Sequence, residues 1–443
     1  MKTKKKFGFY YFLILTVLLI LPIQGFSQQG EKQDSELFKW LKTIPGMEID
    51  TIRVPRDSVP AYKEAYRIML EQPLDHKDPD GKKFKQQIYV SHLDKSKPVV
   101  LVTRGYTIGR NRPVELSRLL DANQIVVEHR FFWKSVPEEM EWKYLTIKQA
   151  AADHHRITTL FKQFYSGKWV NTGVSKGGQT ALFHRRFYPD DVDVTVAYVA
   201  PINAALHDKR VNFFIDKRVG TQKERELLRQ FQIRILENRD AVLPIFIEDT
   251  KKSKLTFPIG DEMAFEYIVL EYTFSFWQYG DGDISKVPGE NATPQEMLDH
   301  LKKVVGFRTY SASGMNSPSM YQNHTEIGYY SYVDGHLKQL LKKVKDPTNI
   351  IFAPEYEKIK FDPSVIKDIT RWLMYEGNNI IYINGGNDPW GAPVIELTGN
   401  TNAVKIIVEN RNHGVKIRHC TDKQKDLVFS HLEKWLDMKI KRD

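Results

Sequence analysis

The chain has 443 residues, of which 41% are hydrophobic and 27% are charged, a composition typical of a globular protein with a sizeable core. Its formal net charge is +10 and its charges are spread along the sequence, which argues against a nucleic-acid-binding protein. The single cysteine, Cys420, excludes an intrachain disulfide, and no motif of a cysteine nucleophile surrounds it.

Residues 1–27 have the pattern of a secretory signal peptide. Four lysines precede an apolar run over residues 7–23, and the small residues Gly25 and Ser27 follow it. Removing this segment lowers the net charge from +10 to +6. The apolar run approaches the ~20 residues of a spanning helix, so an uncleaved membrane anchor is the alternative. We expect export to the periplasm or outside the cell, with membrane contact only through this segment before cleavage.

The next part of the chain, after a polar stretch, has the pattern of a sheet. Residues 67–104 alternate strand-like segments with turns, which predicts an antiparallel start. Apolar strands then alternate with helices, which predicts a parallel sheet with helical crossovers. The predicted strands cover 124–132, 168–175 and 194–201, and the predicted helices cover 147–165 and 176–188.

This alternation stops over residues 203–375, where amphipathic helical patterns dominate. Strand patterns return at 378–393 and 402–414, and a final helix is predicted at 422–439. The sequence therefore predicts a sheet domain in two parts, 28–202 and 376–443, with a helical cap inserted at 203–375.

Residues 173–178, with the sequence GVSKGG, fall between a predicted strand and a predicted helix. A serine in such a turn needs glycines on either side because the backbone bends so sharply that larger side chains would clash. This context is that of a nucleophile elbow, in which Ser175 is exposed at the edge of the sheet.

A serine nucleophile needs a base and an acid, which follow it in that fold on loops after later strands. Asp388 lies in the turn after the strand IIYIN, and His413 lies 25 residues further, after KIIVEN. We expect His413 to take the serine proton and Asp388 to orient its imidazole. Glu409 is a possible substitute for the acid, although it lies on a strand.

Two backbone N–H groups are candidates for the oxyanion hole, those of Lys176 after the nucleophile and of Tyr106 in the loop after an early strand. Glu128 and Arg130 end another strand at the same predicted edge of the sheet. They could contact a ligand there, or pair with each other and brace the catalytic loops.

No cofactor is expected, since the sequence has no Walker or dinucleotide glycine pattern. No histidine pair has convincing spacing for a metal site either.

Five segments together resemble the secreted bacterial prolyl tri- and tetrapeptidyl aminopeptidases, which belong to the α/β-hydrolase clan and are similar to Pro-X carboxypeptidase and dipeptidyl peptidase II. They are GVSKGG (173–178), EHRFF (128–132), YLTIKQAAADHHRI (144–157), EYTFSFWQYG (271–280) and NDPWGAP (387–393). The resemblance implies an α/β-hydrolase fold and removal of short N-terminal peptides from oligopeptides, chiefly after proline, through an acyl-enzyme on Ser175.

Recognition of a free N-terminal amine requires a carboxylate in a closed site. Glu266 and Glu271 lie in an aromatic stretch of the cap, so we expect one of them to bind the amine; salt bridges to cap lysines or arginines are the alternative. Trp277 and Trp390 are candidates for an apolar proline pocket, together with Phe274 and Phe276.

The fold and the catalytic residues do not determine which acyl compound the serine attacks, so two other functions stay open. One is a carboxyl-esterase or acyltransferase of the same fold, and the other is a non-catalytic peptide-binding protein.

Overall fold

The computed structural model describes residues 34–54, 59–280, 282–315 and 317–442. The expected signal peptide lies outside these residues. Within them, no helix combines the length and the apolar character needed to cross a bilayer.

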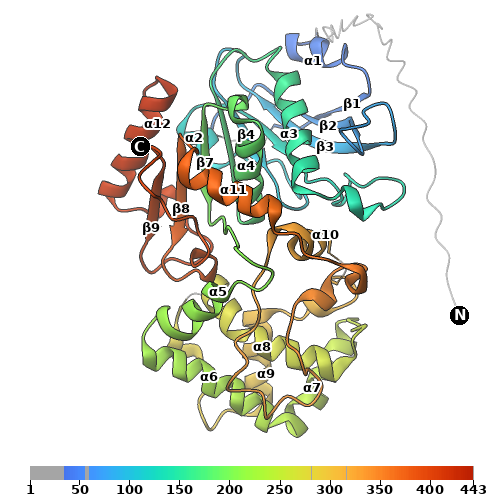
Figure 1. Ribbon diagram of the computed structural model, residues 1–443, viewed down its shortest axis with the longest axis vertical. Coiled ribbons are helices and arrows are strands. Elements are labelled where there is room, and N and C mark those ends of the chain that lie inside the picture. Colours follow the sequence, from blue (N-terminus) through green and yellow to red (C-terminus); the bar gives the residue numbers. More distant parts are fainter. Residues whose placement is uncertain (1–33, 55–58, 281, 316, 443) are drawn as a thin grey trace, which may run out of the picture.

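A nine-stranded sheet forms the centre of the larger part of the molecule, in the spatial order β1-β2-β3-β5-β4-β6-β7-β8-β9 (Figure 1). The pairs β1–β2, β2–β3 and β3–β5 are antiparallel. All the other neighbouring pairs, from β5–β4 to β8–β9, are parallel. The strands are β1 (Met47–Ile52), β2 (Glu64–Pro73), β3 (Lys83–His92), β4 (Val99–Thr103), β5 (Asn123–Val127), β6 (Trp169–Val174), β7 (Val194–Tyr198), β8 (Ile380–Gly385) and β9 (Val404–Val408).

Helices cover both faces of this sheet, because the central strands β4 to β7 are apolar runs buried on both sides. One face packs against α1 (Glu36–Leu41), α3 (Ile147–Phe161), α4 (Lys176–Phe187) and α11 (Ser364–Tyr375), and the other against α2 (Glu115–Leu119) and α12 (Asp422–Leu436). This arrangement confirms the expected α/β-hydrolase fold.

The chain between β7 and α11 forms a separate helical layer beside the sheet domain, which we call the insertion (Figure 1). Its helices are α5 (Lys209–Phe213), α6 (Gln222–Glu237), α7 (Arg239–Lys252), α8 (Asp261–Tyr279), α9 (Pro294–Val305) and α10 (Pro318–Gln322). Reciprocal capping boxes begin α6 at Thr221 and α9 at Thr293.

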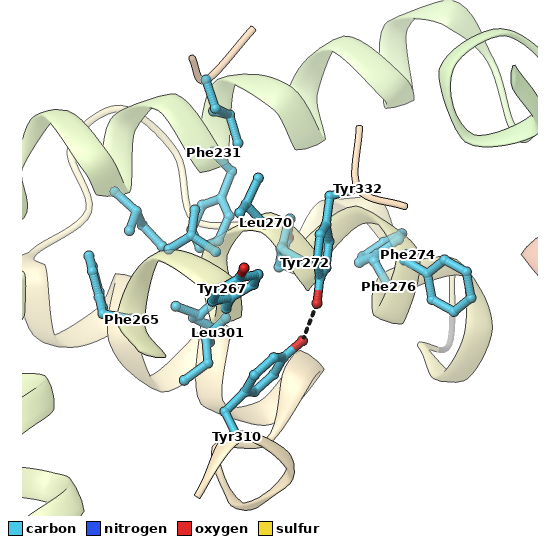
Figure 2. Close-up of a cluster of buried hydrophobic side chains, with 14 of the residues drawn as sticks. Phe231, Phe265, Tyr267, Leu270, Tyr272, Phe274, Phe276, Leu301, Tyr310 and Tyr332 are labelled. Atoms are coloured by element: carbon cyan, nitrogen blue, oxygen red, sulfur yellow. Dashed lines mark hydrogen bonds between the residues drawn. The ribbon is translucent and has the colours of Figure 1, made fainter. Parts of the chain in front are cut away.

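Helix α8 is the centre of the insertion, since nearly all of its residues from Ala264 to Gln278 are buried. A helix that is apolar on all sides needs partners all round. Aromatic side chains from the neighbouring segments supply them, as Figure 2 shows for Phe231, Tyr310 and Tyr332.

Two details differ from the expectation. Residues 364–375, which we expected in the cap, form α11 and pack against α4 and β8, with Ile366, Ile369 and Leu373 buried against the sheet domain. The stretch before residue 67 is not featureless, because Met47–Ile52 pairs with β2 as the edge strand β1. Apolar and polar residues are equally frequent in β1 and none of them is fully buried, since β1 lies at the edge of the sheet.

Candidate active site

Ser175 occupies a strained turn between β6 and α4, with φ 58° and ψ −128°. A Cβ atom on Gly173 would lie 2.1 Å from the carbonyl oxygen of Gly177, and one on Gly177 would lie 2.6 Å from that of Thr103. The strand, the turn and the helix therefore approach so closely that only glycine fits at these two positions. The backbone has the geometry that the elbow motif predicts.

Asp388 and His413 meet at the same end of the sheet, in the loops after β8 and β9. The Asp388 Oδ2 atom lies 2.6 Å from His413 Nδ1, and its Oδ1 atom accepts the backbone N–H of Trp390. Both side chains are buried. Because the carboxylate favours a proton on Nδ1, Nε2 is left as an acceptor, and it has no hydrogen-bond partner within the described chain. Asp388, not Glu409, is the acid that contacts this histidine.

The loop after β4 packs directly on the elbow. A Cβ atom on Gly105 would lie 2.6 Å from the backbone carbonyl carbon of Lys176 and 2.7 Å from the backbone nitrogen of Gly177. This contact places the backbone of Tyr106 beside the first turn of α4, where N–H groups have no acceptor within the helix. Burial raises the pKa of the Tyr106 hydroxyl, and the adjacent Ser175 hydroxyl opposes that shift.

A cavity of about 210 Å³ lies between this edge of the sheet and the insertion. Its floor includes Tyr106, Ser175 and Lys176, and its other walls include Glu271 from α8 and Trp390 from the Asp388 loop. Among the predicted substrate-binding residues, the structure therefore brings Glu271 and Trp390 to the nucleophile.

Glu271 is almost fully buried, at 7% exposure, and its carboxylate accepts hydrogen bonds only from hydroxyl groups. The Tyr330 hydroxyl donates at 2.6 Å and the Ser275 hydroxyl at 2.9 Å. Burial raises the pKa of Glu271 to about 7. No lysine or arginine of the described residues pairs with it, so the alternative role in a cap salt bridge does not apply to this carboxylate.

Glu266 does not line this cavity, so it is not the carboxylate that binds the amine; the alternative expectation, a salt bridge inside the cap, holds for it. Its carboxylate pairs with Arg239 at 2.6 Å and accepts the backbone N–H groups of Lys342, Lys343 and Val344. All of its acceptor capacity is used inside the insertion.

Trp277 is also absent from the cavity walls, so its predicted role in a proline pocket is wrong. Its ring packs against Phe276 and against Gly220, where a Cβ atom would lie 2.5 Å from the indole. Trp277 belongs to the aromatic core of the insertion.

Glu128 and Arg130 are buried braces of the loops, but they do not pair with each other as expected. Glu128 accepts the Ile108 backbone N–H at 2.9 Å and the Ser135 hydroxyl at 2.8 Å. Arg130 forms a fully buried ion pair with Asp153 of α3 at 2.7 Å. Neither lines the cavity, so Glu128 is not a substrate contact.

The Lys176 side chain is a functional candidate that the sequence did not reveal, because only its backbone was considered. Its ammonium group is buried, donates to Gln322 Oε1 at 2.5 Å and lies 3.4 Å from His129 Nε2. Burial lowers the pKa of Lys176 to about 7, opposed by the charge of Glu326. The contact with Gln322 ties the nucleophile elbow to α10 of the insertion.

Aromatic rings form the wall beside Glu271, and two of them, Tyr329 and Tyr330, come from a segment that has no motif. The Tyr330 ring stacks on Phe274 at 3.9 Å between centroids, and the Trp390 ring lies edge-on to both, at 5.3 Å from Phe274 and 5.4 Å from Tyr330. Tyr329 lies 5.4 Å from Trp390. In the described part of the chain, no group of histidine, cysteine and acidic residues gathers as a metal site.

Known proteins similar to this chain are found by comparison of its sequence. A family model described as PS-10 peptidase S37 matches residues 31–440. The chain is 32% identical over 406 residues to a prolyl tri/tetrapeptidyl aminopeptidase of Streptomyces mobaraensis, covering 88% of this chain and 83% of that protein. It is 27% identical over 166 residues to the human thymus-specific serine protease, covering 33% of this chain and 32% of that protein.

Solved structures to which the chain is similar include the proline iminopeptidase of Mycobacterium smegmatis. That structure aligns with a TM-score of 0.38 and 11% identity, over 83% of this chain and 99% of its own.

Proposed function

Because this chain belongs to the PS-10 peptidase S37 family and is a serine peptidase, we propose that it releases tripeptides or tetrapeptides from the free N-termini of oligopeptides, preferentially after proline. The S. mobaraensis relative carries that activity in its name, and the motifs of this sequence resemble the same family. The observation that carries the proposal is the buried carboxylate of Glu271 in the cavity that Ser175 lines.

Glu271 suits a peptide N-terminus because its environment lacks a cation. A carboxylate bonded only to hydroxyl groups in a buried site is poorly stabilised, so an ammonium group that enters the cavity gains a strong charge-assisted hydrogen bond. A peptide with a blocked N-terminus forfeits that interaction.

The bond cleavage follows the serine hydrolase sequence. His413 Nε2 takes the proton of Ser175 as its oxygen attacks the scissile carbonyl carbon, and Asp388 stabilises the imidazolium. The N–H groups of Tyr106 and Lys176 stabilise the oxyanion of the tetrahedral intermediate. The C–N bond then breaks, and the imidazolium protonates the leaving amine. Water repeats the steps on the acyl-enzyme and releases the short peptide with a new carboxylate.

Proline preference is supported by the aromatic wall. Phe274, Tyr330 and Trp390 present rigid apolar surfaces beside the nucleophile, and a pyrrolidine ring fits such a surface without an unpaired polar group. The insertion supplies most of the residues that line the cavity, which favours action on a chain end.

Export is part of the same proposal. Residues 1–27 carry the lysine-rich and apolar regions of a signal peptide, so the enzyme would meet its oligopeptides in the periplasm or outside the cell.

The test is a substrate series of tripeptide and tetrapeptide anilides that end in proline, each with a free and an acetylated N-terminus. We expect turnover of the free-amine substrates and loss of reaction with a fluorophosphonate in Ser175→Ala. Turnover of short-chain esters without any peptide turnover would support the esterase alternative. No labelling of the wild-type protein would support a non-catalytic binding protein.

A further inference from the structure

A second cavity, of about 350 Å³, lies on the other side of the loop that carries Tyr106. It is lined by the ends of β4, β6 and β7, by the start of α2 and by the segment just after His413. Tyr106 lines both this cavity and the one with Ser175. The second cavity thus lies at the carboxyl ends of parallel strands, where ligands bind in open α/β sheets.

Four cationic side chains surround this cavity, those of Arg104, Arg118, Lys416 and Arg418. Within the described chain, none of the four forms an ion pair. The Nε atom of Arg104 is buried without a hydrogen-bond partner among the same residues. The Lys416 ammonium lies 4.9 Å above the ring of Tyr198.

Glu115 is the acidic residue in the lining, and its oxygens are occupied. It accepts the Tyr198 hydroxyl at 3.0 Å and the backbone N–H groups of Ile417 and Arg418 at 2.9 Å each. Burial lowers the pKa of Lys416; Glu115 opposes this, and the nearby Arg418 and Arg104 add to it. The cavity lining therefore holds four cations and one carboxylate, which leaves an excess of positive charge.

We propose that this second cavity binds a small oxyanion, either phosphate or a carboxylate group. Guanidinium groups hold such ligands through paired N–H donors, and an ammonium adds a further donor. The anion would lie between the loop of Tyr106 and the loop of His413. The oxyanion is either a free ion or the C-terminal carboxylate of a peptide held in the neighbouring active site.

Calorimetric titration with inorganic phosphate at constant ionic strength tests the binding without any substrate. We expect one site in the wild-type protein, and at least a tenfold weaker affinity in the double variant Arg104→Gln/Lys416→Gln, because each loses a charge-assisted hydrogen bond. The double variant Arg118→Gln/Arg418→Gln should weaken binding too. Arg118 and Arg418 are exposed, so replacing them should not prevent folding. This second variant therefore tests phosphate binding even if the first variant does not fold.

The matched control is Arg308→Gln/Lys360→Gln, which removes the same charges from exposed positions outside both cavities. It should bind phosphate as the wild-type protein does. Absence of phosphate binding to the wild-type protein would overturn the proposal, and so would unchanged affinity in both cavity variants.

The source of the oxyanion is decided by kinetics on peptides with a free or an amidated C-terminus. If the site holds the substrate carboxylate, phosphate should raise KM only for the free-carboxylate peptides. If it holds a free ion, phosphate should affect both peptides alike. The calorimetric result stands whether or not the proposed peptidase specificity holds.

Discussion

Replacing Glu271 by glutamine is the most direct test of how the enzyme recognises its substrate. The variant keeps the shape of the side chain but removes the charge that faces the cavity. A hydrogen bond to a charged group contributes about 1.5–3 kcal/mol, and 1.4 kcal/mol corresponds to a tenfold change in affinity. KM for a free-amine peptide should therefore rise about 10- to 150-fold, with little change for its acetylated analogue.

The pH dependence gives an independent measure of the same carboxylate. Burial raises the pKa of Glu271 from 4.5 to about 7, so it becomes ionised only as the pH rises through about 7. KM for free-amine peptides should fall over that range, and rise again above about 8 as the substrate amine loses its proton. In Glu271→Gln the first of these changes should disappear.

The rise in pH that improves substrate binding should lower the stability of the folded protein. A carboxyl whose folded pKa is raised destabilises the folded state once it ionises, so the free energy of unfolding of the wild type should fall, relative to Glu271→Gln, between pH 4.5 and about 7. Denaturant titrations at three pH values measure this difference.

The control for these experiments is Glu262→Gln, on the same helix but in a surface pair with Lys343. It should leave both KM values and their pH profile unchanged. An equal rise of KM for free-amine and acetylated peptides in Glu271→Gln would refute the assignment of this carboxylate to the amine.

Three further predictions concern the catalytic loops and their support. Ser175→Ala and His413→Ala should each abolish most peptide turnover while circular dichroism stays unchanged, because triad members act as a unit; wild-type rates in His413→Ala would contradict its role as the base. Gly105→Ala forces a Cβ atom against the elbow, so kcat should fall about 10²- to 10³-fold, as after loss of one oxyanion donor, and an unchanged kcat would argue against this loop. Asp153→Asn leaves the charge of Arg130 buried without its partner and should lower the free energy of unfolding by about 3–5 kcal/mol, measured by urea titration. A loss below about 1 kcal/mol would contradict that estimate.

Local sequence was enough to predict the features that depend on short-range geometry. The spacing of Gly173 and Gly177 around Ser175 follows from a turn in which any Cβ atom would clash. The order of Asp388 and His413 after β8 and β9 follows from the connectivity of the sheet.

Choices among similar side chains depended on tertiary packing instead. Glu266 and Glu271 lie five residues apart on one buried helix, and the sequence offers the same aromatic surroundings for both. Only the tertiary structure distinguishes them, because it shows Glu266 bonded to Arg239 and to the backbone at 342–344 inside the insertion, away from the cavity. In the same way, Arg130 pairs with Asp153 from α3, since Glu128 is turned toward the Ile108 backbone.

The insertion also has a consequence for how this enzyme could diversify. Ser175, Asp388 and His413 all lie on loops of the sheet domain, whereas Glu271 and most of the aromatic wall come from one continuous stretch between β7 and α11. Sequence changes confined to that stretch would remodel the size and charge preference of the cavity while the bond-breaking apparatus stays as it is. Grafting the stretch from a relative onto this sheet is thus a route to new specificities, provided that residue 322 keeps a partner for Lys176.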